Sequence, residues 1–157
     1  MITYEIGKEY HKFSSGHFTI FPDGSRERLH GHNYQASATV VADADAVPDY
    51  RVLKDALLAE CEALDEYVLI PSQAEGLGYR VEAGSCEVTF GGDRFVFPEG
   101  DVRVLPVENA SVECLAEYIL DGFARRLTEA GVVYRNVAVT ISSGAGQQVR
   151  VDGGEHA

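Results

Sequence analysis

Apolar and polar residues alternate along several stretches of the chain, as they do in half-buried β-strands. The clearest stretch predicts a strand over 30–44, with one apolar and one polar face: Tyr34, Ala36, Ala38 and Val40 against Gln35, Ser37 and Thr39. Further strands are predicted over residues 1–13, 13–20, 102–107 and 134–142. Residues 79–97 also alternate and contain the turn signal Gly91-Gly92-Asp93, which predicts a hairpin.

Two other segments place apolar residues every three or four positions, as an amphipathic helix does. The first covers residues 51–66 and follows the start signal Pro48-Asp49. The second begins after a cap at Ser111 or Asn109 and runs to about residue 130, where Gly131 closes it. This order of elements predicts one α+β domain over residues 1–157, with two helices on one face of an antiparallel sheet. Residues 152–157 are expected to form a loose polar tail.

Three histidines form the main candidate site of the chain. His30 and His32 stand two apart on the predicted strand, so both side chains point to one face, and Gly31 between them allows the backbone to bend or to be approached closely. His17 can add a third imidazole from a neighbouring strand. Three neutral imidazoles with one open position commonly hold a catalytic zinc. His11 lacks a partner in the sequence and is expected at the surface or behind the ligands.

Charge and cysteine content narrow the function classes. The formal net charge is −12, and no basic stripe is present, so nucleic-acid binding is not expected. The three cysteines form no Cys-x-x-Cys pair and fit a reducing cytoplasm. No leader or membrane span is expected. The edges of a small sheet favour pairing with further copies, so a homo-oligomer is expected, the alternative being a monomer with charged edges.

Several motifs occur in a characteristic order: FSSGH, LHGHNY, DYRVLK at residues 49–54, Leu64-Asp65 and the helix opening ASVECLAEYI. In these motifs the chain resembles the 6-pyruvoyl-tetrahydropterin and 6-carboxytetrahydropterin synthase family. The resemblance implies a tunnelling fold, in which sheets of several subunits join into a barrel with active sites at the subunit interfaces. It also implies zinc on His17, His30 and His32, and dihydroneopterin triphosphate as substrate. Residues 71–107, which hold the predicted hairpin, look like an insertion found in some relatives.

Three positions depart from the family pattern. Arg26 stands at the position of the catalytic cysteine, and Ser25 at the position where some relatives carry a glutamate. The Asp-His proton relay reads Asp65-Glu66. The glutamate that holds the pterin on the last strand has no counterpart, since residues 139–144 contain no acidic residue. Glu113 matches another family position and can bind substrate or simply favour its helix N-terminus.

These features predict a zinc-dependent lyase or cyclase that acts on a small polar metabolite other than the standard pterin. Proton transfer is assigned to Asp65 with Glu66, or to Glu27, and Arg26 is expected to neutralise an anionic substrate group. A first alternative is a pterin or deazapurine pathway synthase acting on dihydroneopterin triphosphate, with Ser142 or Ser143 replacing the anchor. A second alternative is a catalytically inactive paralogue that retains zinc.

Overall fold

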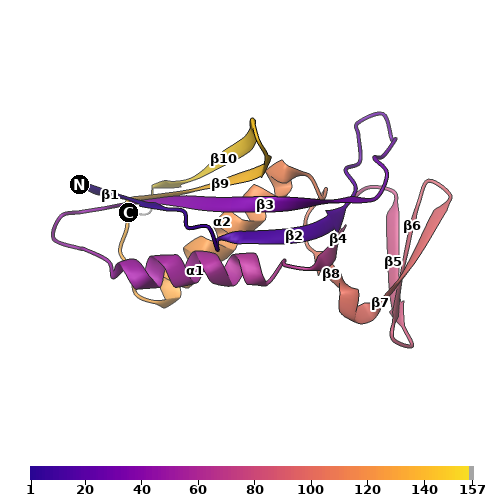
Figure 1. Cartoon of the computed structure of the whole chain (residues 1–157), viewed down its shortest axis with the longest axis horizontal. Helices are drawn as coiled ribbons and strands as arrows, with labels where there is room; N and C mark the ends of the chain where they lie inside the picture. Colours follow the sequence, from indigo (N-terminus) through magenta and orange to yellow (C-terminus); the bar gives the residue numbers. More distant parts are fainter. Residues whose placement is uncertain (156–157) are drawn as a thin grey trace.

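The structure is a computed structural model that describes residues 1–155. These residues form one long curled sheet, two helices beneath it and a small second sheet at one end (Figure 1). The elements follow in this order: β1 (Ile2–Ile6), β2 (Lys12–His17), β3 (His30–Ala42), α1 (Tyr50–Glu62), β4 (Tyr67–Pro71), β5 (Leu77–Glu82), β6 (Ser85–Phe90), β7 (Asp93–Pro98), the 3₁₀ turn η1 (Glu99–Asp101), β8 (Val102–Leu105), α2 (Val112–Glu129), β9 (Asn136–Gly144) and β10 (Gln147–Glu155).

The large sheet has the order β10-β9-β3-β2-β4-β8, and β1 pairs with the far half of β3. The strands β1, β2, β3, β9 and β10 pair antiparallel, as expected. The expectation of a purely antiparallel sheet is wrong at one edge, where β4 pairs parallel with β2 and β8 pairs parallel with β4. The reason is the connection through α1, which carries the chain from β3 past β2, so that β4 runs antiparallel to β3 and therefore parallel to β2.

The predicted first strand over residues 1–13 is two strands, because the chain leaves the sheet between Ile6 and Lys12. His11 turns inward at this break and is fully buried, so the surface position expected for it is wrong. Its Nδ1 accepts a hydrogen bond from the Lys8 amide (3.0 Å), and its Nε2 donates to the Lys54 carbonyl of α1 (3.0 Å). His11 therefore fastens the break between β1 and β2 to the first helix.

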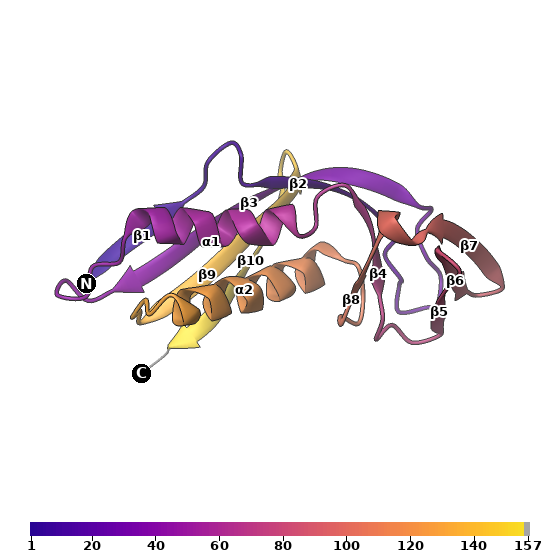
Figure 2. The ribbon, with the colours of Figure 1, turned by 90° about the horizontal axis from the view of Figure 1, so that it is seen from below.

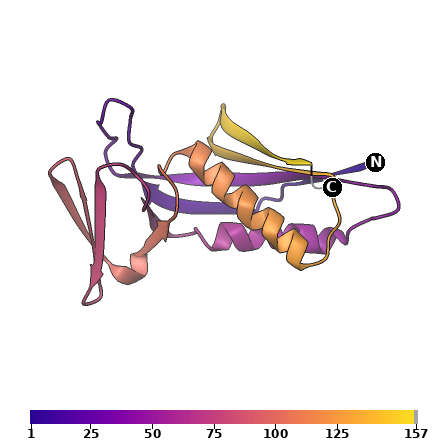
Figure 3. The same cartoon turned by 180° about the vertical axis from the view of Figure 1, so that it is seen from behind.

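Both helices cover the same face of the sheet, which confirms the predicted arrangement (Figures 2 and 3). Asp49 caps α1 by accepting from the Arg51 amide, and Ser111, rather than Asn109, caps α2 by accepting from the Cys114 amide. The apolar stripes of the helices meet the inward residues of β2, β3 and β9 in one core that includes Tyr34, Leu57 and Phe123. The described residues contain no helix long and apolar enough to cross a membrane.

The predicted hairpin over residues 79–97 is a three-stranded meander, β5-β6-β7. The turn at Gly91-Gly92 is confirmed, but a second turn at Ala83-Gly84, where both residues have positive φ, was missed. Cys86 and Val88 of the meander are buried together with Ile70 of β4. The meander therefore shares a small core with the edge of the large sheet and is packed against it.

The predicted tail over residues 152–157 is wrong for residues 152–155, which belong to β10 and continue the pairing with β9. Polar composition suggested a tail, but Val149 and Val151 pack against the core and carry the strand onward. The rest of the predicted tail lies outside the described residues.

Candidate metal centre and active site

The β2-β3 ladder brings the three histidines together. His17 and His30 are register partners, and His32 faces the next inward position of β2, Ser15. The ligand-capable nitrogen atoms of His17, His30 and His32 all lie within 4.8 Å of one another. The predicted cluster of three imidazoles is thus present. A β-carbon at Gly31 would come within 3.3 Å of the Ser15 carbonyl, a tight contact, so glycine favours the close strand approach at this point.

His17 is held by the segment that leads into α2. Its Nδ1 donates to the Ala110 carbonyl (2.6 Å), which leaves Nε2 with a free lone pair. That Nε2 is buried and has no hydrogen-bond partner among the described residues. Burial, followed by the neighbouring His30 and His32, lowers the pKa of His17, so its ring is neutral at pH 7. A buried neutral imidazole with an unpartnered nitrogen is suited to bind a cation.

His30 is oriented in the same way as His17. Its Nδ1 donates to the Arg28 carbonyl (2.7 Å), and its Nε2 lies 3.0 Å from Nε2 of His32. Backbone carbonyls that hold the far nitrogen of a ligand are the usual outer support of a metal-binding histidine, because they fix its tautomer and direction. The donor set of the cluster therefore fits a divalent transition-metal ion, and zinc is one that imidazoles prefer.

The carboxylate of Glu27 lies beside this cluster. Its Oε2 is 3.7 Å from Nε2 of His30 and accepts a hydrogen bond from the Thr19 amide (3.1 Å). The Glu27 amide in turn donates to the Thr19 carbonyl (2.9 Å), so the loop between β2 and β3 folds back on itself to present the side chain. Of the acidic residues predicted from the sequence, Glu27 is the one that the structure brings to the histidines.

Asp65 and Glu66 lie at the junction of α1 and β4, next to β2. Asp65 accepts a hydrogen bond from the Ser14 amide (2.8 Å), and the Glu66 amide donates to the Ser14 carbonyl (2.7 Å). Glu66 shares an open hollow of about 520 Å³ with His32, while Asp65 lines an adjoining one of about 600 Å³. The pair thus borders the site from the far side of β2 but makes no hydrogen bond to the histidines among the described residues.

Four predicted substrate-binding residues are dispersed. Arg26 forms an ion pair with Asp93 of the meander (2.6 Å). Glu113 is exposed in the first turn of α2, three residues after the Ala110 carbonyl that holds His17. Ser142 pairs in register with Gln35, and it and Ser143 lie where β9 turns into β10. At about 3.3 Å per residue, Gln35, the partner of Ser142, lies roughly 10 Å from His32 along β3, and Ser142 is on the next strand.

The sequence pattern predicts Tyr34 only as part of the apolar face of its strand, but Tyr34 also borders the site. Its ring centroid lies 5.6 Å from that of His32 and 6.1 Å from that of His17. The hydroxyl is buried and has no hydrogen-bond partner among the described residues. The signal was available, because Tyr34 follows His30 and His32 at the same alternating spacing and must share their face.

Comparison with known proteins identifies the family. The family model described as 6-pyruvoyl tetrahydropterin synthase matches residues 5–151. The chain belongs to this family. A putative 6-carboxy-5,6,7,8-tetrahydropterin synthase of Methanocaldococcus jannaschii is 27% identical over 141 residues, which cover 87% of this chain and 86% of that protein.

Solved structures of 6-pyruvoyl tetrahydropterin synthases share the fold. The Plasmodium falciparum protein matches with a TM-score of 0.87 at 23% identity, and the Plasmodium vivax protein with 0.86 at 24%, each over 96% of both chains. Two further P. vivax structures, at 23% identity, are of variants in which a glutamate described as a catalytic residue is replaced by alanine or by cysteine. The tunnelling fold predicted for the subunit is thereby confirmed, while the joining of several subunits into a barrel stays a prediction.

Proposed function

We propose that this member of the 6-pyruvoyl tetrahydropterin synthase family is a zinc-dependent lyase, with zinc held by His17, His30 and His32. The observation that carries the proposal is the buried, unpartnered Nε2 of His17 within 4.8 Å of the other two imidazoles. Bound zinc supplies Lewis-acid polarisation of a substrate oxygen. The backbone carbonyls of Arg28 and Ala110 hold Nδ1 of His30 and His17, so Nε2 is the nitrogen of each ring that would coordinate the ion.

In this proposal Glu27 is the proton acceptor. The Glu27 carboxylate lies 3.7 Å from Nε2 of His30, so it is within reach of a substrate group bound next to the three histidines. The Thr19 amide occupies one lone pair of Oε2 and fixes the carboxylate, while about a third of the side chain stays accessible. In the P. vivax relative a glutamate is described as a catalytic residue, which supports a carboxylate as the proton acceptor in this fold.

The substrate we propose is a small polar metabolite other than dihydroneopterin triphosphate. The family resemblance implies a glutamate on the last family strand that holds the pterin, and this chain has no carboxylate at residues 139–144. Ile141 of that segment is fully buried, and the Ser142 hydroxyl donates to the Gly144 carbonyl (2.9 Å). A pterin would therefore leave buried donors unpaired, which typically costs about 1–3 kcal/mol.

A second candidate substrate is dihydroneopterin triphosphate itself, which the 27% identical putative 6-carboxytetrahydropterin synthase favours. The deciding experiment incubates zinc-loaded protein with dihydroneopterin triphosphate and follows the products by liquid chromatography. The variants His30→Ala and Glu27→Gln serve as controls. We expect one zinc per chain, loss of zinc in His30→Ala, retained zinc in Glu27→Gln, and no turnover of the pterin by any form.

If the unaltered protein converts dihydroneopterin triphosphate and Glu27→Gln does not, the pterin is the substrate. Glu27 would then remain the proposed proton acceptor. Absence of bound zinc in the unaltered protein would overturn the proposed function as a whole. Zinc binding without conversion of any small hydroxylated metabolite would favour the inactive paralogue.

A further inference from the structure

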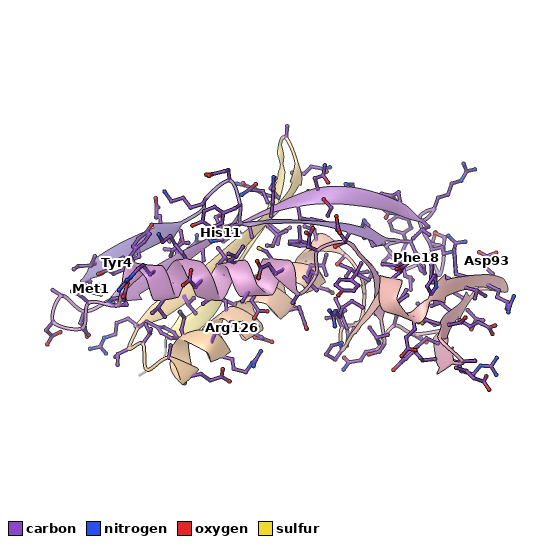
Figure 4. The ribbon with its side chains drawn as sticks, turned by 60° about the horizontal axis from the view of Figure 1, so that its bottom comes forward. Met1, Tyr4, His11, Phe18, Asp93 and Arg126 are labelled. Atoms are coloured by element: carbon purple, nitrogen blue, oxygen red, sulfur yellow. The ribbon has the colours of Figure 1, made fainter. Side chains whose placement is uncertain are left out.

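We propose that the meander β5-β6-β7 belongs to the active site, because its Asp93 holds Arg26 and Arg26 positions Glu27. Arg26 is then a positioning residue and does not bind substrate. The proposal rests on the proposed function in one respect, the role of Glu27. Figure 4 shows Phe18, which flanks this contact, and Asp93 at the same end of the molecule, far from Arg126 at the other end of the helix layer.

The guanidinium of Arg26 is held by the meander and by Phe18. Its Nη2 and Nε both donate to Oδ2 of Asp93 (2.6 and 3.2 Å). The guanidinium carbon also lies 5.2 Å from the ring centroid of Phe18 and 4.9 Å from that of Phe95. A charge-assisted pair combined with two cation–π contacts holds the side chain in one place, and only a fifth of it is exposed.

The third nitrogen of the guanidinium fixes the backbone of Glu27. Nη1 of Arg26 donates to the Glu27 carbonyl (2.8 Å), while the Glu27 amide donates to the Thr19 carbonyl (2.9 Å). Both the backbone amide and the backbone carbonyl of Glu27 are therefore hydrogen-bonded. The side chain that extends from it reaches the Thr19 amide and stops 3.7 Å from Nε2 of His30.

The meander can act as a rigid support because it is packed onto the large sheet. Phe95, which contacts Arg26, stacks at 5.4 Å from Phe18 in the active-site loop. Phe95 and Phe97 pack against the core formed by Ile70, Cys86 and Val88. A displacement of about 1 Å at a catalytic group can cost roughly a hundredfold in rate, so a support of this kind has a measurable effect.

The test uses Asp93→Asn in the full chain, with Glu87→Gln as the matched control. Glu87 pairs with Arg94 (2.6 Å) inside the same meander but does not touch Arg26. By amide hydrogen exchange we expect the Glu27 and Phe21 amides, which bond within the loop, to exchange roughly tenfold faster in Asp93→Asn. They should be unchanged in Glu87→Gln and in Asp93→Glu, which keeps the carboxylate.

Turnover on the substrate identified for the protein gives the second measurement. Asp93→Asn should lower kcat roughly ten- to a hundredfold with little change in KM and with zinc still bound. The same change made in a Glu27→Gln background should have no further effect, since Asp93 acts through Glu27.

Equal losses in both backgrounds, or an unchanged exchange rate in Asp93→Asn, would overturn the proposal. If the protein turns over no substrate, the proposed function fails by itself, and the exchange comparison alone decides whether the meander holds the loop.

Discussion

The side chain of Asn109 makes two hydrogen bonds to the main chain of Ile20. Its Nδ2 donates to the Ile20 carbonyl (2.8 Å), and its Oδ1 accepts from the Ile20 amide (3.0 Å). The next residue, Ala110, holds His17 through its carbonyl. Two consecutive residues before α2 thus fix both a histidine of the proposed metal site and the loop that presents Glu27.

Replacement of Asn109 by alanine should therefore weaken the site and the fold together. Both Ile20 backbone groups lose their partner, and unsatisfied groups of this kind cost about 1–3 kcal/mol. We expect the free energy of unfolding in urea to fall by that amount, and zinc affinity to fall with it. Gln148→Ala, at an exposed position of β10, serves as a control and should change stability by less than about 0.5 kcal/mol. Equal stability of the two variants would contradict the role given to Asn109.

His11 should make the protein less stable in acid. Burial lowers the pKa of His11 in the folded state below its ordinary value of 6.5. The unfolded chain therefore binds more protons below pH 6.5, and stability is present above that pH and is lost as pH falls through it. A protonated ring could no longer accept from the Lys8 amide, which gives the same sign.

The measurement is the free energy of unfolding from pH 8 to pH 5 for the zinc-bound protein and for His11→Gln. We expect the slope of the parent protein to exceed that of the variant by at most about 1.4 kcal/mol per pH unit, the limit for one proton. Identical slopes would show that His11 does not titrate with folding.

Local pattern was enough to predict the histidine cluster, but not which of the three candidate carboxylates lies beside it. Alternation alone puts His30, His32 and Tyr34 on one face, and pairing with the preceding strand adds His17. Glu27 reaches the cluster because its loop folds back through the pairing of Ile20 with Arg26 and contacts Asn109, which is 89 residues away from Ile20. Such long-range contacts produce no repeating pattern of apolar and polar residues that could be recognised in the sequence.

The missed strands have equally specific causes. Residues 67–71 form a five-residue strand that ends at Pro71, too short to show a period. The polar residues at the end of the last strand predict a tail, although Val149 and Val151 alternate as a strand requires. Residues 67–71 are placed by pairing with the distant strand β2, and the last strand is placed by its hairpin with β9, so pairing and not local preference decides both structures.

A larger residue at Gly122 should destabilise the fold while Glu60 is present, because the buried Glu60 carboxylate would have to move. A β-carbon at Gly122 would collide with the Glu60 carboxylate of α1, which is buried and paired with Arg126 (2.5 Å). We expect Gly122→Ala to destabilise the fold by about 1–3 kcal/mol in urea unfolding. In a Glu60→Ala background the collision is absent, so the two effects should be strongly non-additive. Gly100→Ala, which meets open space, should be close to neutral.

Tyr34 offers a substitution that should stabilise the protein. Its hydroxyl is buried without a partner among the described residues, and burial, followed by the charge of Glu27, raises the pKa of the group. Tyr34→Phe removes a desolvated polar atom and keeps the ring that stacks on Phe13 at 4.8 Å, so we expect a gain of about 1 kcal/mol.

The matched control is Tyr50→Phe, since the Tyr50 hydroxyl donates to the Glu5 carbonyl (2.5 Å) and its removal should reduce stability. Thermal unfolding of the metal-free variants measures both effects: the expected gain of stability in Tyr34→Phe and the expected loss in Tyr50→Phe. A loss of stability in Tyr34→Phe would mean that a solvent molecule satisfies the hydroxyl inside the histidine cluster. In that event Tyr34 would join Glu27 as a polar group available to an oxygen bound there.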